Sequence, residues 1–308
     1  MTGRHIGAVA GTLLAGIGCM KADRLVAVQN DAVQMDGGGD ASLVVGTPFF
    51  APTPVTGLVA DTTTDAHGPS LTGDELQISF SCVRQGEATY HIWTSTRDSR
   101  DAKWNVATMV DDLLSAYNEQ DPDVSPDGKT IYFASDQSGE GYQLFVSQQT
   151  PTGWGNPTLV QGQGLVSSSL DFRGPSVDPS GLFMTFCSAP RGSEDFTLYS
   201  ASRANLLAAW GNVQRLAVNS SMADADPALF NDSRSLVWSS RAPSNGRSWD
   251  LVEISLDPSS PFSAASIPLD SLNTAISERY PWVSRDGTHI LFTREAVGAP
   301  GVIYEAWR

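Results

Sequence analysis

Residues 121 to 135 read DPDVSPDGKTIYFAS, and the architecture of the whole chain follows from this stretch. Apolar residues alternate with small or polar ones on both sides of Pro126-Asp127-Gly128, which predicts two short strands joined by a tight hairpin. The same skeleton recurs at intervals of 53, 53, 52 and 54 residues, at Pro69, Pro122, Pro175, Pro227 and Pro281. The chain therefore contains five copies of one structural unit.

Alignment on these prolines gives columns of shared character. An apolar residue stands nine positions after each proline and an aromatic residue eleven after: Ile78 and Phe80, Ile131 and Phe133, Met184 and Phe186, Leu236 and Trp238, Ile290 and Phe292. Both columns have the same parity, so they face one side of a strand and are expected to pack between neighbouring sheets. The hairpin column holds Asp74, Asp127, Ser180, Asp232 and Asp286, which we interpret as turn residues and not as catalytic ones.

Each unit continues with two further strands. The third begins near His91, Gln143, Thr197, Leu251 and Val302, and a fourth follows an aromatic residue at Trp104, Trp154, Trp210 and Phe262. Four strands in a unit of about 40 to 55 residues are typical of propeller blades. We therefore predict an all-β fold, a five-bladed β-propeller of four-stranded antiparallel blades.

The fifth unit reaches Arg308 directly after its third strand, so its outer strand is missing there. Pro48, Phe49 and residues 55 to 59 resemble the outer-strand segment of the fourth unit. We expect residues 48 to 60 to add to the strands within 276 to 308, which would close the ring and remove two sheet edges. The last blade is thus predicted to be closed by the N-terminal strand.

The segment before the propeller differs in composition. Residues 6 to 18 form a short apolar run after a basic start, and residues 1 to 18 are interpreted as an export signal. The run also resembles a bacterial lipoprotein signal, which implies lipidation of Cys19, although Gly16 stands where that family usually has leucine. The alternative is cleavage elsewhere, giving a soluble secreted protein. Residues 19 to 46 are expected to be a flexible tether and residues 47 to 308 the propeller.

Charge and cysteine content exclude several classes of protein. The net charge of -15 opposes a role that depends on neutralising nucleic-acid phosphates, and favours a partner with basic patches or a cation. Cys82 and Cys187 belong to the first and third units, too far apart for a disulfide, so two buried thiols are expected. The four histidines are scattered, which predicts no zinc site, and His289 is expected on a hairpin surface.

Polar residues gather just before each proline, where the loop from an outer strand to the next inner strand reaches the mouth of the central channel. They are Asp65, His67, Glu119, Asp121, Asp171, Arg173, Asp224, Asp226, Glu278, Arg279 and Tyr280. Three interpretations stay open for them. They can bond exposed backbone groups of the loops, form a binding rim for a peptide or protein, or supply the two carboxylates that glycoside hydrolysis needs.

Two resemblances bear on this choice. Arg173-Gly174-Pro175 is similar to an Arg-Asp-Pro motif of the five-bladed arabinanase-type glycosidases, which place their acids at this mouth, but glycine replaces the aspartate here. Ser125-Pro126-Asp127-Gly128-Lys129, followed by an apolar strand, resembles the repeat core of TolB-type, WD-repeat-like propellers of the bacterial envelope. Weaker copies occur at residues 178 to 181 and 284 to 287. This resemblance implies a docking platform.

We therefore predict a non-catalytic binding module, exported to the periplasm or cell surface and held at the outer membrane as a lipoprotein. Its expected partner is an envelope protein or peptide, or a glycan; no nucleic acid is expected, membrane contact is limited to the lipid anchor, and the chain is expected to be a monomer. The enzymatic alternative is an arabinanase-type glycoside hydrolase. No cofactor is expected, except that Asp224 and Asp226 offer calcium two ligands, which alone make a poor site.

Overall fold

The computed structural model describes residues 46–58, 64–83, 86–241, 248–255 and 265–308. The predicted export signal, the lipidation site Cys19, nearly all of the tether and Phe262 lie outside these residues. No helix in the described part of the chain has the length and apolar character needed to cross a bilayer.

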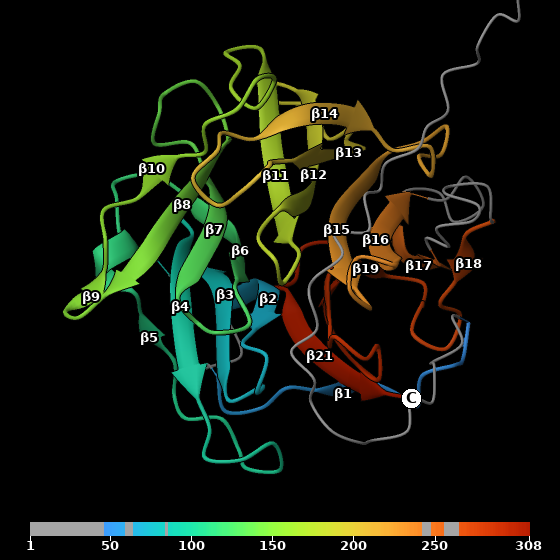
Figure 1. Ribbon diagram of the computed structural model, residues 1–308. Helices are drawn as coiled ribbons and strands as arrows, with labels where there is room; N and C mark the ends of the chain where they lie inside the picture. The colour runs from blue at the N-terminus through green and yellow to red at the C-terminus, as the bar shows by residue number, and fades with distance from the viewer. Residues whose placement is uncertain (1–45, 59–63, 84–85, 242–247, 256–264) are drawn as a thin grey trace, which may run out of the picture. The chain divides into compact units, whose positions relative to one another are not determined.

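Five antiparallel sheets surround one axis, as the sequence predicted (Figure 1). Their innermost strands form a closed ring: β2 contacts β6, β6 contacts β11, β11 contacts β15, β15 contacts β19, and β19 contacts β2.

The strands of each blade are given from the axis outward. Blade 1 contains β2 Asp65–Leu71, β3 Gln77–Val83, β4 His91–Thr96 and β5 Thr108–Met109. Blade 2 contains β6 Glu119–Val124, β7 Thr130–Ser135, β8 Gln143–Thr150 and β10 Thr158–Leu159, and β9 Gly153–Trp154 also pairs with β8. Blade 3 contains β11 Leu170–Val177, β12 Phe183–Pro190, β13 Thr197–Ser202 and β14 Gly211–Arg215. Blade 4 contains β15 Asp224–Phe230, β16 Ser235–Arg241, β17 Trp249–Ser255 and β18 Ile267–Pro268. Blade 5 contains β19 Ser277–Val283, β20 His289–Glu295, β21 Val302–Trp307 and β1 Thr53–Pro54.

The aromatic column forms the cores between blades. Phe80, Phe133, Phe186 and Phe292 are completely buried, and Trp238 nearly so. Phe292, for example, packs with Val237 and Leu251 of the fourth blade. The period-2 pattern of each second strand directs one face to the neighbouring sheet, and this burial is the main stabilising contribution to the ring.

The residues of the hairpin column stabilise the tight turns. The Ser125 hydroxyl donates to Asp127 Oδ1 at 2.7 Å, and the Lys129 N–H donates to the same oxygen at 3.1 Å. Gly128 follows with φ of +70°, a conformation that costs glycine little. These carboxylates therefore hold the tight turn that reverses the chain.

The fifth blade is closed from the N-terminal side. β1 pairs with β21, with Thr53 opposite Glu305 and Pro54 opposite Tyr304. The Phe50 N–H also donates to the Trp307 carbonyl at 2.7 Å. The predicted addition of the segment beginning at residue 48 is thus confirmed, and it leaves no free outer edge on β21.

A recurring arginine explains why Phe49 takes the outer-strand position. In blades 1, 3 and 5 the arginine after the third strand donates its Nε–H to a carbonyl of the hairpin turn in the same blade, 2.7 to 2.9 Å away. Its guanidinium lies over the outer-segment aromatic ring, in the pairs Arg97 with Trp104, Arg203 with Trp210 and Arg308 with Phe49, at 4.3, 4.4 and 4.3 Å. Phe49 therefore completes for blade 5 what Trp104 and Trp210 complete for their own blades.

The described residues contain no disulfide, and Cys82 and Cys187 are both buried thiols, as predicted. Burial raises the pKa of the Cys187 thiol. That thiol is consequently protonated at neutral pH and unreactive.

Candidate functional site at the channel mouth

A bulge precedes the proline of every inner strand. The pairing register shifts there in all five blades, and the residue before each proline adopts a left-handed conformation, with φ between 53° and 63°. Those residues are Gly68, Asp121, Gly174, Asp226 and Tyr280. Residues other than glycine rarely adopt this backbone conformation, which costs about 1–3 kcal/mol for each of them. Such strain concentrates at functional sites.

Two of the strained residues are carboxylates, and each is held by an arginine of the next blade. Arg173 Nε lies 2.9 Å from Asp121 Oδ2, and Arg279 Nε lies 3.1 Å from Asp226 Oδ2. Burial opposes ionisation of Asp121, but Arg173, His67 and the Gly174 N–H together outweigh burial, so the pKa of this carboxyl lies below its usual value. The structure thus brings together four of the predicted residues as two ion pairs.

His67 and Tyr280 form the aromatic part of this site. Their rings stack with centroids 4.8 Å apart, and the Tyr90 ring lies 4.6 Å from His67 on another side. Burial lowers the pKa of His67 to about 4, so the imidazole is neutral at physiological pH. The Tyr90 hydroxyl donates to Asp65, which also accepts the Gly301 N–H at 2.7 Å.

Three of the predicted acids hold loops. Each is almost completely buried and accepts a hydrogen bond from the hydroxyl residue four positions earlier. The pairs are Glu119 with Ser115, Asp224 with Ser220 and Glu278 with Thr274. Asp224 also accepts the indole N–H of Trp238 at 3.0 Å. These contacts correspond to the first of the three interpretations of the sequence, in which the polar residues bond groups of the loops.

Asp171 has a comparable role between blades. Its carboxylate accepts the Tyr142 N–H at 2.9 Å and the Gly192 N–H at 2.8 Å, which ties two neighbouring loops. The calcium alternative is not favoured by geometry, because Asp224 bonds Ser220 and Trp238 while Asp226 bonds Arg279. Across the described ranges no three His, Cys, Asp or Glu side chains are grouped to hold a metal ion.

An open cavity of about 730 Å³ lies at the mouth. Residues from blades 1, 3, 4 and 5 line it, among them Asp65, Tyr90, Glu194, Trp249, Arg279 and Glu295. Sequence reasoning missed Glu295, because it ends the second strand of its blade and does not lie in the loop before a proline. Glu295 stands fourteen residues after Pro281, in the column that holds Arg241 in blade 4, and charged residues in that column were the available signal.

Glu295 is the distinctive group in this cavity. Among the described residues its carboxylate makes no hydrogen bond and no ion pair. Burial raises its pKa, Arg279 lowers it, and Asp226 and Asp65 raise it further, so the net direction is upward. By contrast, Arg279 is paired with Asp226, and Arg241 is paired with Glu194 at 3.0 Å.

Comparisons with known proteins give a likeness of fold. A scan against protein-family models found no match, and a search of curated proteins found no significantly similar sequence. Among solved structures, the catalytic domain of the GH62 alpha-L-arabinofuranosidase from Coprinopsis cinerea is 12% identical with a TM-score of 0.56, over 84% of this chain and 96% of that one. A thermostable family-43 glycoside hydrolase is 13% identical with a TM-score of 0.52, over 82% and 91%.

TolB from Acinetobacter baumannii is 16% identical with a TM-score of 0.47, over 79% of this chain. The match spans about half of that protein, 54% of its length. At their identities the two glycoside hydrolase structures show a likeness of fold alone, and the TolB match supports no inference about this chain. The function has to be argued from the site.

Proposed function

We propose that the chain is a non-catalytic binding protein whose mouth cavity receives a basic side chain of a partner protein or peptide. The observation that carries this proposal is the unpartnered carboxylate of Glu295 in an open cavity where both lining arginines are already paired. Asp65, beside it, accepts hydrogen bonds but has no cation partner within the described residues. The uncompensated charge of the cavity is therefore negative.

The carboxylates at the bulges support binding in preference to catalysis. Asp121 and Asp226 are each neutralised by an arginine and fixed in a left-handed conformation, so neither is a free acid or base. At Gly174, the position of the missing aspartate, an added Cβ would lie 3.2 Å from the Asp226 Cα. The ring of inner strands is thus packed too closely for an aspartate at Gly174 without a local shift.

The proposed setting is the bacterial envelope, with the monomeric chain held by a lipid on Cys19 and the tether giving the propeller reach. Radiolabelled palmitate incorporated into the natural chain but not into Cys19→Ala would support the anchor. A natural chain that takes up no label would contradict it.

The binding prediction is tested with labelled tri-arginine and tri-lysine peptides, and tri-glutamine as the neutral probe. Glu295→Gln is expected to weaken binding of the basic peptides about thirtyfold or more, since removing one partner of a desolvated charge pair costs about 2–5 kcal/mol. Asp127→Asn makes the same change of net charge at an exposed hairpin turn and serves as the control. Fluorescence anisotropy gives the dissociation constants.

The pKa of Glu295 sets the pH dependence of this binding. Since it is raised, the carboxyl takes up a proton at a higher pH than an ordinary glutamate, and affinity is expected to fall as the pH drops through that value. Equal affinities for the natural chain and Glu295→Gln, with Asp127→Asn unchanged as well, would show that the mouth does not select basic groups through this residue.

The glycoside hydrolase alternative has one observation in its favour. Glu295, with its raised pKa, and Asp65 line the same cavity, and an acid with a nearby carboxylate is the pair that glycosidases use. This alternative predicts release of reducing sugar from arabinan or xylan, with loss of about a hundredfold or more in Glu295→Gln. A purified chain that releases no sugar from either polymer, and binds neither on a glycan array, would exclude the glycan interpretation.

A further inference from the structure

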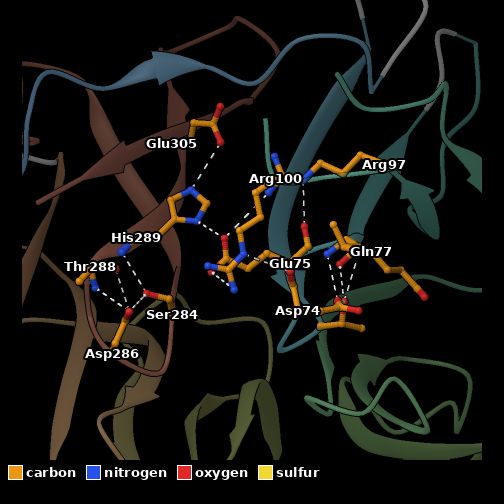
Figure 2. Close-up of polar contacts among 12 residues, drawn as sticks. Asp74, Glu75, Gln77, Arg97, Arg100, Ser284, Asp286, Thr288, His289 and Glu305 are labelled. Atoms are coloured by element: carbon orange, nitrogen blue, oxygen red, sulfur yellow. Dashed lines mark hydrogen bonds and ion pairs between the residues drawn. The ribbon is translucent and has the colours of Figure 1, made fainter. Parts of the chain in front are cut away.

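A buried histidine joins the first and fifth blades at a distance from the mouth cavity. His289 opens β20, and its Nδ1 lies 2.9 Å from Glu75 Oε2, in the hairpin turn of blade 1. Its Nε2 lies 3.4 Å from Glu305 Oε2 on β21. Figure 2 shows the imidazole between the two carboxylates. The expectation that His289 lies on a hairpin surface is wrong, since it is only 2% exposed.

Packing fixes the orientation of this ring. The Trp307 ring stacks on His289 with centroids 4.5 Å apart and planes 4° from parallel, and Trp282 meets it edge-on at 5.9 Å. The backbone N–H of His289 donates to the Ser284 hydroxyl at 2.9 Å. Glu75 itself holds φ of +60°, so its turn is shaped to bring the carboxylate across the seam between the blades.

The charged groups around the histidine come from every element packed against it. They are Glu305 on β21; Asp74 and Glu75 in the β2–β3 turn; Arg97, Arg100 and Asp101 after β4; and Asp286 in the β19–β20 turn. Arg97 and Arg100 lie 3.9 and 3.5 Å from Glu75, so that carboxylate has cations besides His289. The only ion pair of Glu305 among the described residues is with His289.

Hydrogen-bond chemistry then dictates the protonation state of the ring. A carboxylate only accepts, and a neutral imidazole has one N–H donor and one acceptor nitrogen. The Nδ1 contact with Glu75 has hydrogen-bond geometry, whereas Nε2 and Glu305 meet only at ion-pair distance, without a hydrogen bond. The imidazolium is therefore the state of the ring that is attracted to both carboxylates. In agreement with this, burial tends to lower the pKa of His289, but Glu305 and Glu75 outweigh burial and raise it above its usual value.

We propose that His289 is a proton-operated latch between the first and fifth blades, closed while the imidazole carries both protons and weakened when it loses one. The direction follows from linkage. A histidine whose pKa is higher in the folded state stabilises fully below the unfolded value of 6.5, and this contribution is lost as the pH rises through the folded value. Deprotonation removes the one described cation at ion-pair distance from Glu305 and leaves the longer-range attraction of Arg97, so the seam loosens on the alkaline side.

His91 provides a matched comparison within the chain. Its Nδ1 lies 2.6 Å from Glu119 Oε2, but its Nε2 faces the Thr89 hydroxyl at 3.0 Å. A hydroxyl can donate or accept, so a neutral ring satisfies both contacts. His91 therefore faces one carboxylate, whereas His289 faces two. For this reason His91→Gln is the control for His289→Gln.

The test is native-state hydrogen exchange of the full chain between pH 6 and pH 9, corrected for intrinsic exchange rates. Protection of β1, β21 and the β2–β3 turn is expected to fall about tenfold over this range, because the ring loses the charge that strengthens its hydrogen bond to Glu75 and forms its ion pair with Glu305. His289→Gln should start with the lower protection at pH 6 and show no further fall. His91→Gln should behave as the natural chain does.

A second measurement keeps the proposal testable if His289→Gln does not fold. In Glu305→Gln the histidine and Glu75 remain, and the loss of protection is expected at a lower pH, in step with the His289 titration followed by imidazole nitrogen NMR. Seam protection that does not change with pH in the natural chain, or that changes equally in His289→Gln, would overturn the latch. So would a His289 resonance that titrates at or below pH 6.5.

Discussion

Arg308→Met is expected to lower the free energy of unfolding by about 3–5 kcal/mol, the cost of leaving one partner of a buried ion pair uncompensated. Arg308 and Glu253 have completely buried side chains and meet through two contacts, of 2.7 Å and 2.9 Å. Without the guanidinium, the Glu253 carboxylate stays buried beside the Gly46 N–H, 3.2 Å away. Urea unfolding followed by circular dichroism gives the midpoint and the slope.

The double variant Glu253→Met with Arg308→Met is the informative control. Replacing both members of a buried pair by apolar groups of similar volume is often neutral, so most of the lost stability should return. Arg308 also lies over Phe49 and donates to the Gly287 carbonyl, and these losses remain in both variants. A single variant within about 1 kcal/mol of the natural chain would mean that Glu253 finds another partner or water.

Phe292→Ala is expected to cost about 3–5 kcal/mol, because it removes a large side chain from a closely packed core and leaves a cavity between blades 4 and 5. Phe292 is 0% exposed and packs against Val237 and Leu251. Phe50→Ala removes the same group from a residue that is 73% exposed, and should change stability by less than about 0.5 kcal/mol.

Both phenylalanine variants are measured by the same urea titration. Equal effects of the two substitutions would contradict the assignment of the aromatic column to the interfaces between blades. A cost at Phe292 well below that of a buried phenylalanine would mean that the two sheets collapse onto the space left behind.

The fold could be predicted because its determinants are local and repeated. Strand burial follows period 2 over a few residues, and the turn residues stand at a fixed offset from each proline, so five copies reinforce one interpretation. The closure of blade 5 by the N-terminal segment was also predictable, because the sequence around Phe49 resembles the outer-strand segments of other blades. Burial of Phe49 beneath Arg308 is the physical reason for that match.

The mouth was predicted less completely, and the bulges explain why. In a regular strand Glu119 and Asp121 would face the same side, as would Asp224 and Asp226. The left-handed residue before each proline breaks that relation, so the first acid of each pair caps a loop while the second meets an arginine. The role of Glu295 and the partners of His289 could not be predicted from local sequence patterns, because the residues around both side chains come from distant parts of the sequence.

The addition of β1 to β21 also bears on how quickly the protein can fold. Glu305 is synthesised only after blades 1 to 4, which lie between it and Thr53 in the sequence, so the strand that seals the ring must wait for all of them. Pairings between such distant segments are intrinsically slow to form. Until they do, the outer edge of β21 stays open to other chains, and this short interval is when a newly made molecule is most prone to aggregate.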